Sequence, residues 1–302
     1  DYTEWQTLRR YPILNWNMGM TYRLRERDER VYPQGELARR TIGQVGDKGN
    51  YGVEYVLRDV LEGRDGKARR QRIARGFYGR VVGGDNSEPE DGLDVVTTLD
   101  LEMQDVADRA LRRQLEAQNA LWGTALVMEV ATGDLLAMAN LSRTKSGAYA
   151  EVKNHALSSR MEPGSTFKLA ALLALVDDAG MSLDETFDTG NGARVKVGRT
   201  TVQDSHGLPP LNLKDAVAHS SNFFFARAVY ETYKDDPERY VDYLRHLHLD
   251  RTVGLEEFGA VAPIFPAPGM KIWYPDVSIV NMGYGYAIEL TPLHTLTLYN
   301  AV

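Results

Sequence analysis

The sequence predicts an α+β fold in which helices pack against an antiparallel sheet. An amphipathic helix pattern over residues 100–118 is followed by two apolar runs, 123–130 and 135–141. The segment between these runs, 131–134, has the Ala-Thr-Gly-Asp composition of a turn, so the runs form a hairpin. A second, strongly apolar helix pattern covers residues 166–179. Helix, hairpin and helix in this order favour an α+β arrangement over alternating βα units.

Composition excludes several classes of function. The 302 residues suffice for one large domain or two ordinary ones, and the net charge of −7 argues against nucleic acid as a partner. The absence of cysteine excludes disulfides, thiolate metal sites and thiol catalysis. The sequence contains no phosphate-binding or dinucleotide-binding glycine motif, and His246 and His248 lie on different faces of a predicted helix. We therefore expect no cofactor and no metal site.

The N-terminal part is rich in arginine and glycine and predicts little regular structure. Short extended pieces are expected at 20–24 and 80–82, and one helix is expected over 53–61. Residues 83–92 are acidic, glycine-rich and nearly free of apolar side chains, which is typical of a linker. We place the domain boundary there, with a non-catalytic domain at 1–92 and a second domain at 93–302.

The second domain is expected to begin with a strand over 93–99 and a helix from Asp100, its N-cap, to about Gln118. The apolar face expected on that helix comprises Met103, Val106, Ala110, Leu111 and Leu115. An exposed strand is predicted over 194–202. Asn212 is expected to cap a short helix that leads to residues 219–222, and Phe223–Phe225 are expected in the core.

Two more helices complete the pattern. One starts at Asp236-Pro237 and extends to His248, and another starts at Thr291-Pro292, with a Thr cap and proline at the first helical position. This last pattern reaches Val302 without a stop signal, so we expect the chain to be truncated at its C-terminal side. No apolar run is long enough for a membrane helix and no signal peptide is present, although a chain that starts at Asp1 can have lost an N-terminal anchor.

The candidate nucleophile is Ser165, which a Pro-Gly turn delivers to the start of the apolar helix over 166–179. Lys168 follows one helical turn later and lies on the same face. A serine hydroxyl needs a base, and lysine acts as a base only when neutral. Burial and a helix N-terminus both lower a lysine pKa. On this motif alone, an N-cap serine followed by a surface lysine explains the spacing equally well.

The same spacing recurs at Ser142 and Lys145, which shows how little two positions establish. Ser142 is expected in a loop, where nothing holds the lysine against it. A second motif, Ser220-Ser221-Asn222, follows Ser165 by 55 residues and offers a hydroxyl to relay protons and a carboxamide to bind a peptide bond. The two motifs in this order are far more specific than either one.

With both motifs, the sequence resembles the class B penicillin-binding proteins. Ser165-Thr166-Phe167-Lys168 matches the family's Ser-x-x-Lys and Ser220-Ser221-Asn222 its Ser-x-Asn. The resemblance extends to both domains, through the segments 30–38, 52–54, 61–66, 99–104, 132–138 and 283–292. It implies a transpeptidase domain of the penicillin-binding and serine β-lactamase type, preceded by an extended pedestal domain. The family's third motif, Lys-Thr-Gly or Lys-Ser-Gly, is absent and is expected beyond Val302.

The resemblance also implies a mechanism, in which Lys168 deprotonates Ser165 for attack on a peptidoglycan stem peptide, Ser220 passes a proton to the leaving amine, and Asn222 holds the peptide amide. A peptidoglycan D,D-transpeptidase that β-lactams acylate is expected, with a division role favoured by the Glu162-Pro163-Gly164 turn. The implied partners are a membrane-embedded glycan polymerase and division proteins, at the periplasmic face of the inner membrane. A serine β-lactamase or β-lactam sensor domain, and a non-catalytic cell-wall scaffold, remain as alternatives.

Overall fold

The computed structural model describes residues 2–8, 10–12, 31–46, 49–67, 70–74, 77–80, 86–192 and 194–302. The chain divides into two compact units, residues 1–35 and 36–302. In the first unit, the described residues include helix α1 (Tyr2–Leu8). The extended piece expected at 20–24 and residues 81–82 of the second piece lie outside the described residues. The domain boundary predicted at residue 92 remains a prediction.

The second unit begins with short helices and a hairpin: α2 (Arg39–Ile42), α3 (Gly52–Val56), α4 (Arg58–Leu61), β1 (Arg70–Ala74) and β2 (Phe77–Arg80). The helix predicted over 53–61 is therefore present as two helices, interrupted at Leu57. Glycine lets α2 and α3 meet, because a Cβ on Gly52 would lie 2.5 Å from the Cα of Gly43.

The strand predicted over 93–99 does not form. Leu93 donates its backbone N–H to Val60, and the Thr98 hydroxyl donates to the carbonyl oxygen of Leu135 at 2.8 Å. These isolated hydrogen bonds do not make a ladder, and Val96 is 94% exposed. The prediction was wrong because strand propensity is realised only where a neighbouring strand completes the pairing.

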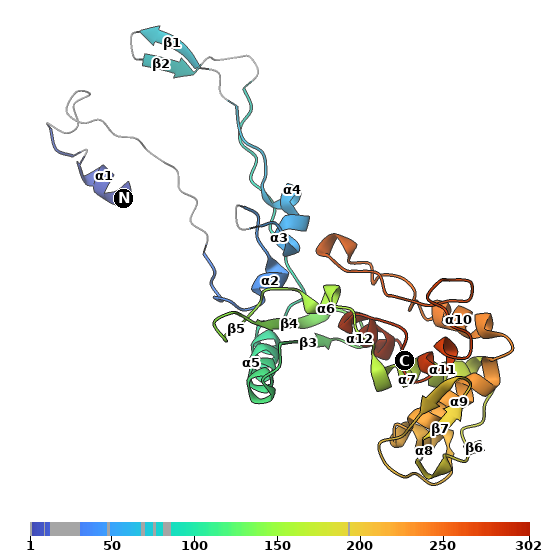
Figure 1. Cartoon of the computed structure of the whole chain (residues 1–302). Helices are drawn as coiled ribbons and strands as arrows, with labels where there is room; N and C mark the ends of the chain where they lie inside the picture. Colours follow the sequence, from blue (N-terminus) through green and yellow to red (C-terminus); the bar gives the residue numbers. More distant parts are fainter. Residues whose placement is uncertain are drawn as a thin grey trace. The chain divides into compact units, whose positions relative to one another are not determined.

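The central sheet is antiparallel in the order β3 (Trp122–Met128), β4 (Leu135–Arg143), β5 (Tyr149–Ala150), so the predicted hairpin is confirmed. Helix α5 (Leu101–Gln118) packs on β3 and β4 (Figure 1). As predicted, Asp100 caps it, since its carboxylate accepts a hydrogen bond from the backbone N–H of Met103 at 2.8 Å.

The apolar face predicted for α5 is wrong in part. Met103 and Val106 are 44% and 59% exposed, while Gln104 is buried. The Gln104 amide exchanges two hydrogen bonds with the backbone of Met138 on β4, at 2.7 and 3.2 Å. A polar side chain occupies the position facing the sheet because it satisfies this backbone, which a pattern of apolar residues does not reveal.

Most of the regular elements in the rest of the chain are helices: α6 (His155–Ser158), the 3₁₀ helix η1 (Gly164–Phe167), α7 (Lys168–Leu173), the π-helical turn η2 (Ala174–Asp178), the 3₁₀ turn η3 (Gly190–Gly192), α8 (Leu213–Ala218), α9 (Asn222–Tyr233), α10 (Pro237–His246), the 3₁₀ turn η4 (Glu256–Phe258), α11 (Ser278–Met282) and α12 (Pro292–Asn300). Two small antiparallel pairs join β6 (Thr186–Phe187) to β9 (Leu211–Asn212) and β7 (Val195–Val197) to β8 (Thr200–Val202).

Several predicted boundaries differ from the structure. The strand expected over 194–202 is the hairpin β7–β8, which turns at Gly198 with φ of 55°. The helix expected over 166–179 has three parts, and the hydroxyl of Tyr233 donates to the carbonyl oxygen of Ala174 where the π turn begins. Helix α10 ends at His246, and α12 ends at Asn300 instead of continuing to Val302.

The main hydrophobic core surrounds α9. Phe223, Phe224 and Phe225 are all buried there, as predicted, because three consecutive helical positions contact different neighbours. Their neighbours in this core come from α7, α10 and α11. This packing fixes α7 and α9, and the candidate active-site residues lie at or just before the first residues of these two helices.

Candidate active site

Ser165 lies in the 3₁₀ turn η1 and is exposed, whereas Lys168 opens α7 and is only 5% exposed. The backbone N–H of Lys168 donates to the carbonyl oxygen of Ser165, which is the i to i+3 bond of a 3₁₀ helix. The predicted approach of the two side chains is confirmed, because Lys168 Nζ lies 3.1 Å from Ser165 Oγ. An accessible hydroxyl therefore contacts a buried amine.

The turn before Ser165 is fixed by the segment 285–290. Met161 forms a bridge with Leu290, and the backbone N–H of Gly164 donates to the carbonyl oxygen of Gly285 at 2.9 Å. A Cβ on Gly285 would lie 1.8 Å from the carbonyl oxygen of Gly164, so only glycine permits this approach. Glu162 adds an acceptor for the backbone N–H of Ala287 at 3.0 Å.

Lys168 also brings the second predicted motif to the first. Its Nζ lies 2.6 Å from the backbone oxygen of Ser220, 3.0 Å from Ser220 Oγ and 2.7 Å from Asn222 Oδ1. The structure thus gathers all the residues that the sequence singled out, Ser165, Lys168, Ser220 and Asn222, around one amine.

The hydrogen-bond partners of Lys168 can accommodate a neutral amine. Four oxygen atoms surround Nζ, and an ammonium would donate to three of them. The two shortest contacts are with carbonyl oxygens, of Ser220 and Asn222, which can only accept. A neutral amine donates to these two and keeps its lone pair for a hydroxyl, which makes it a proton acceptor for Ser165.

Burial makes the neutral form of this amine accessible near neutral pH. Burial lowers the pKa of Lys168 from its ordinary value of 10.5 to about 8, while the negative charge of Asp204 opposes the shift. A base whose pKa lies near the working pH combines a useful neutral fraction with enough basicity to take a proton.

Ser220 lies between α8 and α9, and Asn222 begins α9. Ser220 adopts a left-handed backbone conformation with φ of 51°, which is uncommon for a residue other than glycine and costs on the order of 1 kcal/mol. Asn222 is the first residue of α9, and its Nδ2 donates to the carbonyl oxygen of Gln203 at 3.3 Å. This bond fixes the amide so that Oδ1 faces Lys168.

The sequence analysis missed Asp204, which lies between β8 and β9 and is 5% exposed. Its carboxylate accepts hydrogen bonds from Ser221 Oγ at 2.9 Å and from the backbone N–H groups of Asn222 and Phe223 at 2.5 and 3.1 Å. Asp204 therefore holds the first turn of α9, whose dipole also favours a negative charge there. Its position between two short strands, 16 residues before Ser220, gave no signal in the sequence.

The second Ser-x-x-Lys spacing has no such geometry. Ser142 lies in β4 and not in a loop, and its Oγ hydrogen-bonds to His155 Nε2 at 2.7 Å. Lys145 is exposed in the turn that follows. The strand extends further than predicted because β5 pairs with residues 142 and 143.

Within the part of the chain that the structure describes, no group of three or more His, Asp or Glu side chains is arranged to hold a metal ion. The described helices also include none that is long and apolar enough to cross a membrane.

The family model for the penicillin binding protein transpeptidase domain matches residues 123–302. The chain belongs to this family. Among its relatives, the probable peptidoglycan D,D-transpeptidase PenA of Neisseria meningitidis is 27% identical over 285 residues, which cover 91% of this chain and 47% of the relative. Penicillin-binding protein PbpB of Mycobacterium tuberculosis is 29% identical, with 91% and 41% covered, and peptidoglycan D,D-transpeptidase FtsI of Escherichia coli is 25% identical, with 92% and 47% covered.

Solved structures agree with this assignment to the transpeptidase family. Penicillin binding protein 3 of Mycobacterium tuberculosis, complexed with ampicillin, has a TM-score of 0.74 and 26% identity, with 91% of this chain and 57% of that chain covered. The complex with aztreonam has a TM-score of 0.73. These findings confirm the α+β transpeptidase fold and the resemblance to class B penicillin-binding proteins. The chain spans about half the length of the curated relatives that it matches.

Proposed function

We propose that the protein containing this chain is a peptidoglycan D,D-transpeptidase that works through an acyl-serine intermediate. One observation carries the proposal: the buried Lys168 amine contacts the exposed Ser165 hydroxyl and both Ser220 and Asn222. The names of the relatives PenA and FtsI support the same activity.

In the first step, Ser165 Oγ attacks the carbonyl carbon of the penultimate D-alanine of a stem peptide as its proton passes to Lys168 Nζ. The tetrahedral intermediate collapses when the C–N bond to the terminal D-alanine breaks. Ser220 Oγ, 3.0 Å from Nζ, lies where it can pass that proton to the leaving amine. The amide of Asn222 binds the substrate's peptide bond, and the backbone N–H of Ser165 stabilises the oxyanion.

In the second step, an amine on a neighbouring stem peptide attacks the acyl-serine and loses its proton to Lys168. A new amide bond forms and Ser165 leaves with its proton restored. β-Lactams follow only the first step, because acylation opens their ring and keeps the leaving amine tethered to the acyl group.

The wider setting is part of the proposal. FtsI and penicillin binding protein 3 among the similar proteins support a role in septal wall synthesis. We propose action at the periplasmic face of the inner membrane, through an N-terminal anchor, with a membrane-embedded glycan polymerase and division proteins as partners. Residues 1–92 would form the non-catalytic pedestal and 93–302 the transpeptidase domain.

The test uses the full-length gene product and a fluorescent penicillin. We expect covalent labelling of the wild type, loss of labelling in Ser165→Ala, and normal labelling in the matched control Ser142→Ala. Lys168→Arg should also abolish labelling, because arginine cannot be deprotonated. Thermal melts of each variant separate loss of chemistry from loss of folding.

Two results would contradict the proposed function, and each would indicate a different one. Continuous turnover of a chromogenic cephalosporin, in place of a single covalent labelling, would indicate a β-lactamase. A folded full-length protein that no penicillin labels would indicate a non-catalytic scaffold.

A further inference from the structure

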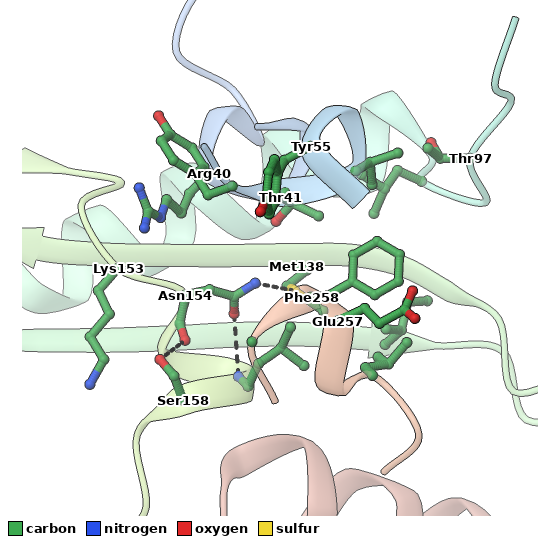
Figure 2. Close-up of a pocket in the computed structure, with 18 of the residues that line it drawn as sticks. Arg40, Thr41, Tyr55, Thr97, Met138, Lys153, Asn154, Ser158, Glu257 and Phe258 are labelled. Carbon is green, nitrogen blue, oxygen red and sulfur yellow. Dashed lines mark hydrogen bonds between the residues drawn. The ribbon is translucent and has the colours of Figure 1, made fainter. Parts of the chain in front are cut away.

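A cavity of about 370 Å³ lies apart from the active site, and none of Ser165, Lys168, Ser220 and Asn222 lines it. Four separated parts of the chain form its walls: 40–41 and 50–55 with helices α2 and α3, 97–99, 135–158 with β4 and α6, and 255–259 with η4. Figure 2 shows these walls around the space. Its volume is in the range of small-molecule sites, which occur preferentially where separate parts of a fold meet.

The cavity has an apolar body. Leu135, Met138, Leu157, Leu255 and Phe258 line it, and all belong to the second hydrophobic cluster of the fold. An occupant with apolar surface would remove these side chains from water, which favours its binding.

Charge is distributed unevenly around this body. Figure 2 shows Arg40 and Lys153 toward one side of the cavity and Glu257 and Phe258 toward the other. The guanidinium of Arg40 lies over the ring of Tyr51, 3.6 Å from its centroid. Among the described residues neither Arg40 nor Lys153 forms a side-chain ion pair.

One polar side chain in the wall has a donor to spare. Asn154 donates its Nδ2 to the sulfur atom of Met138 at 3.3 Å, which is a weak acceptor.

From this combination we infer that the cavity binds a small organic anion with an apolar or aromatic body, and that its occupancy controls acylation of Ser165. The anionic group would pair with Arg40 and Lys153, and the body would lie against Met138, Leu157 and Phe258. The carboxylate of Glu257 repels an anion and so sets the orientation. The controlling role rests on the proposed function, whereas binding does not.

The link to the active site is helix α6. Leu157 and Ser158 of α6 line the cavity, and Ser159 directly after it hydrogen-bonds to His155 Nδ1 at 2.7 Å. The backbone then continues through Met161, paired with Leu290, to Ser165. A ligand that displaces α6 would therefore displace the short backbone segment that leads from Ser158 to Ser165.

The probe is 8-anilinonaphthalene-1-sulfonate, an aromatic sulfonate, titrated into the full-length gene product with fluorescence as the readout. We expect saturable binding to one site. Lys153→Glu should weaken it at least tenfold, whereas the matched control Lys145→Glu, also an exposed lysine, should stay within twofold of the wild type.

Absence of saturable binding, or equal losses in Lys153→Glu and Lys145→Glu, would overturn the binding site.

The controlling role is measured as the rate of fluorescent penicillin labelling with the probe at saturation. A change of at least twofold, absent in Lys153→Glu at the same probe concentration, supports it, and an unchanged rate overturns it. Binding is repeated on Ser165→Ala, which cannot be acylated. Probe binding without labelling of the wild type would refute the proposed function alone, and labelling without probe binding would refute this inference alone.

Discussion

The pKa of Lys168 predicts how acylation depends on pH. With a pKa of about 8, the neutral fraction rises from roughly 9% at pH 7 to roughly 91% at pH 9, a gain of about tenfold that levels off. A lysine at the ordinary value of 10.5 would give about a hundredfold gain over the same range, with no levelling. The curvature of the profile therefore distinguishes a buried base from a surface lysine.

The assay is the second-order rate constant of fluorescent penicillin labelling of the full-length gene product between pH 6 and 9.5, corrected for hydrolysis of the reagent in buffer. A rate that still increases tenfold per pH unit between 8 and 9 would refute the reasoning. So would a profile that is flat above pH 6.

Asp204 supplies an internal check on that profile. Its negative charge raises the pKa of Lys168, so Asp204→Asn should move the midpoint to lower pH. Asparagine keeps one oxygen that can accept from the backbone N–H groups at the start of α9, which limits structural damage. The control is Asp215→Asn, an exposed carboxylate on α8, which should leave the midpoint unchanged. A shift to higher pH in Asp204→Asn would contradict the electrostatic account.

Three further predictions concern the framework of the site. Burial raises the pKa of Glu151 from 4.5 to about 7, so the folded state holds a proton that the unfolded state releases, and stability falls as the pH rises from 4.5 to 7. Glu151→Gln removes this pH dependence of stability. Relative to the wild type, the free energy of unfolding of the variant should therefore rise between pH 5 and pH 8, by up to the order of 3 kcal/mol. Melting temperatures measured at both pH values should show the same direction. Ser220→Gly relieves the strain of a left-handed φ of 51°, so it should raise the free energy of unfolding by up to about 1 kcal/mol and slow the labelling. A variant that loses both stability and labelling would contradict the interpretation of Ser220 as a strained functional residue. Gly285→Ala should abolish labelling and lower the melting temperature, because its Cβ would lie 1.8 Å from the oxygen of Gly164, and unchanged labelling would show that Ser165 does not depend on this contact.

What the sequence predicted well is local. The approach of Lys168 to Ser165 follows from a spacing of one helical turn, and the cap at Asp100 follows from side-chain chemistry that needs only the next three residues. The meeting of Ser165 with Ser220, by contrast, depends on how α7 packs beside α9. No local pattern contains that information, and only the resemblance to a known family supplied it.

The residues that could not be predicted from the sequence are those whose hydrogen-bond partners lie far along the chain. Gln104 lies where an apolar residue was expected because the backbone of β4, 34 residues later, needs its amide. Asp204 lies in a segment without periodicity, yet its three hydrogen bonds go to residues 17–19 positions further on. Composition and spacing cannot identify a side chain whose role is defined by a distant backbone.

The difference between the predicted α-helix and the observed 3₁₀ turn bears directly on catalysis. Side chains at positions i and i+3 eclipse one another in a 3₁₀ helix, whereas in an α-helix they are offset by about 60°. The 3₁₀ bond from the backbone N–H of Lys168 to the oxygen of Ser165 therefore aligns the amine with the hydroxyl. Because α7 begins only at Lys168, the lysine is fixed in the buried helix while Ser165 stays on the exposed turn. One helix start thus places the base where its pKa is lowered and the nucleophile where a substrate can reach it.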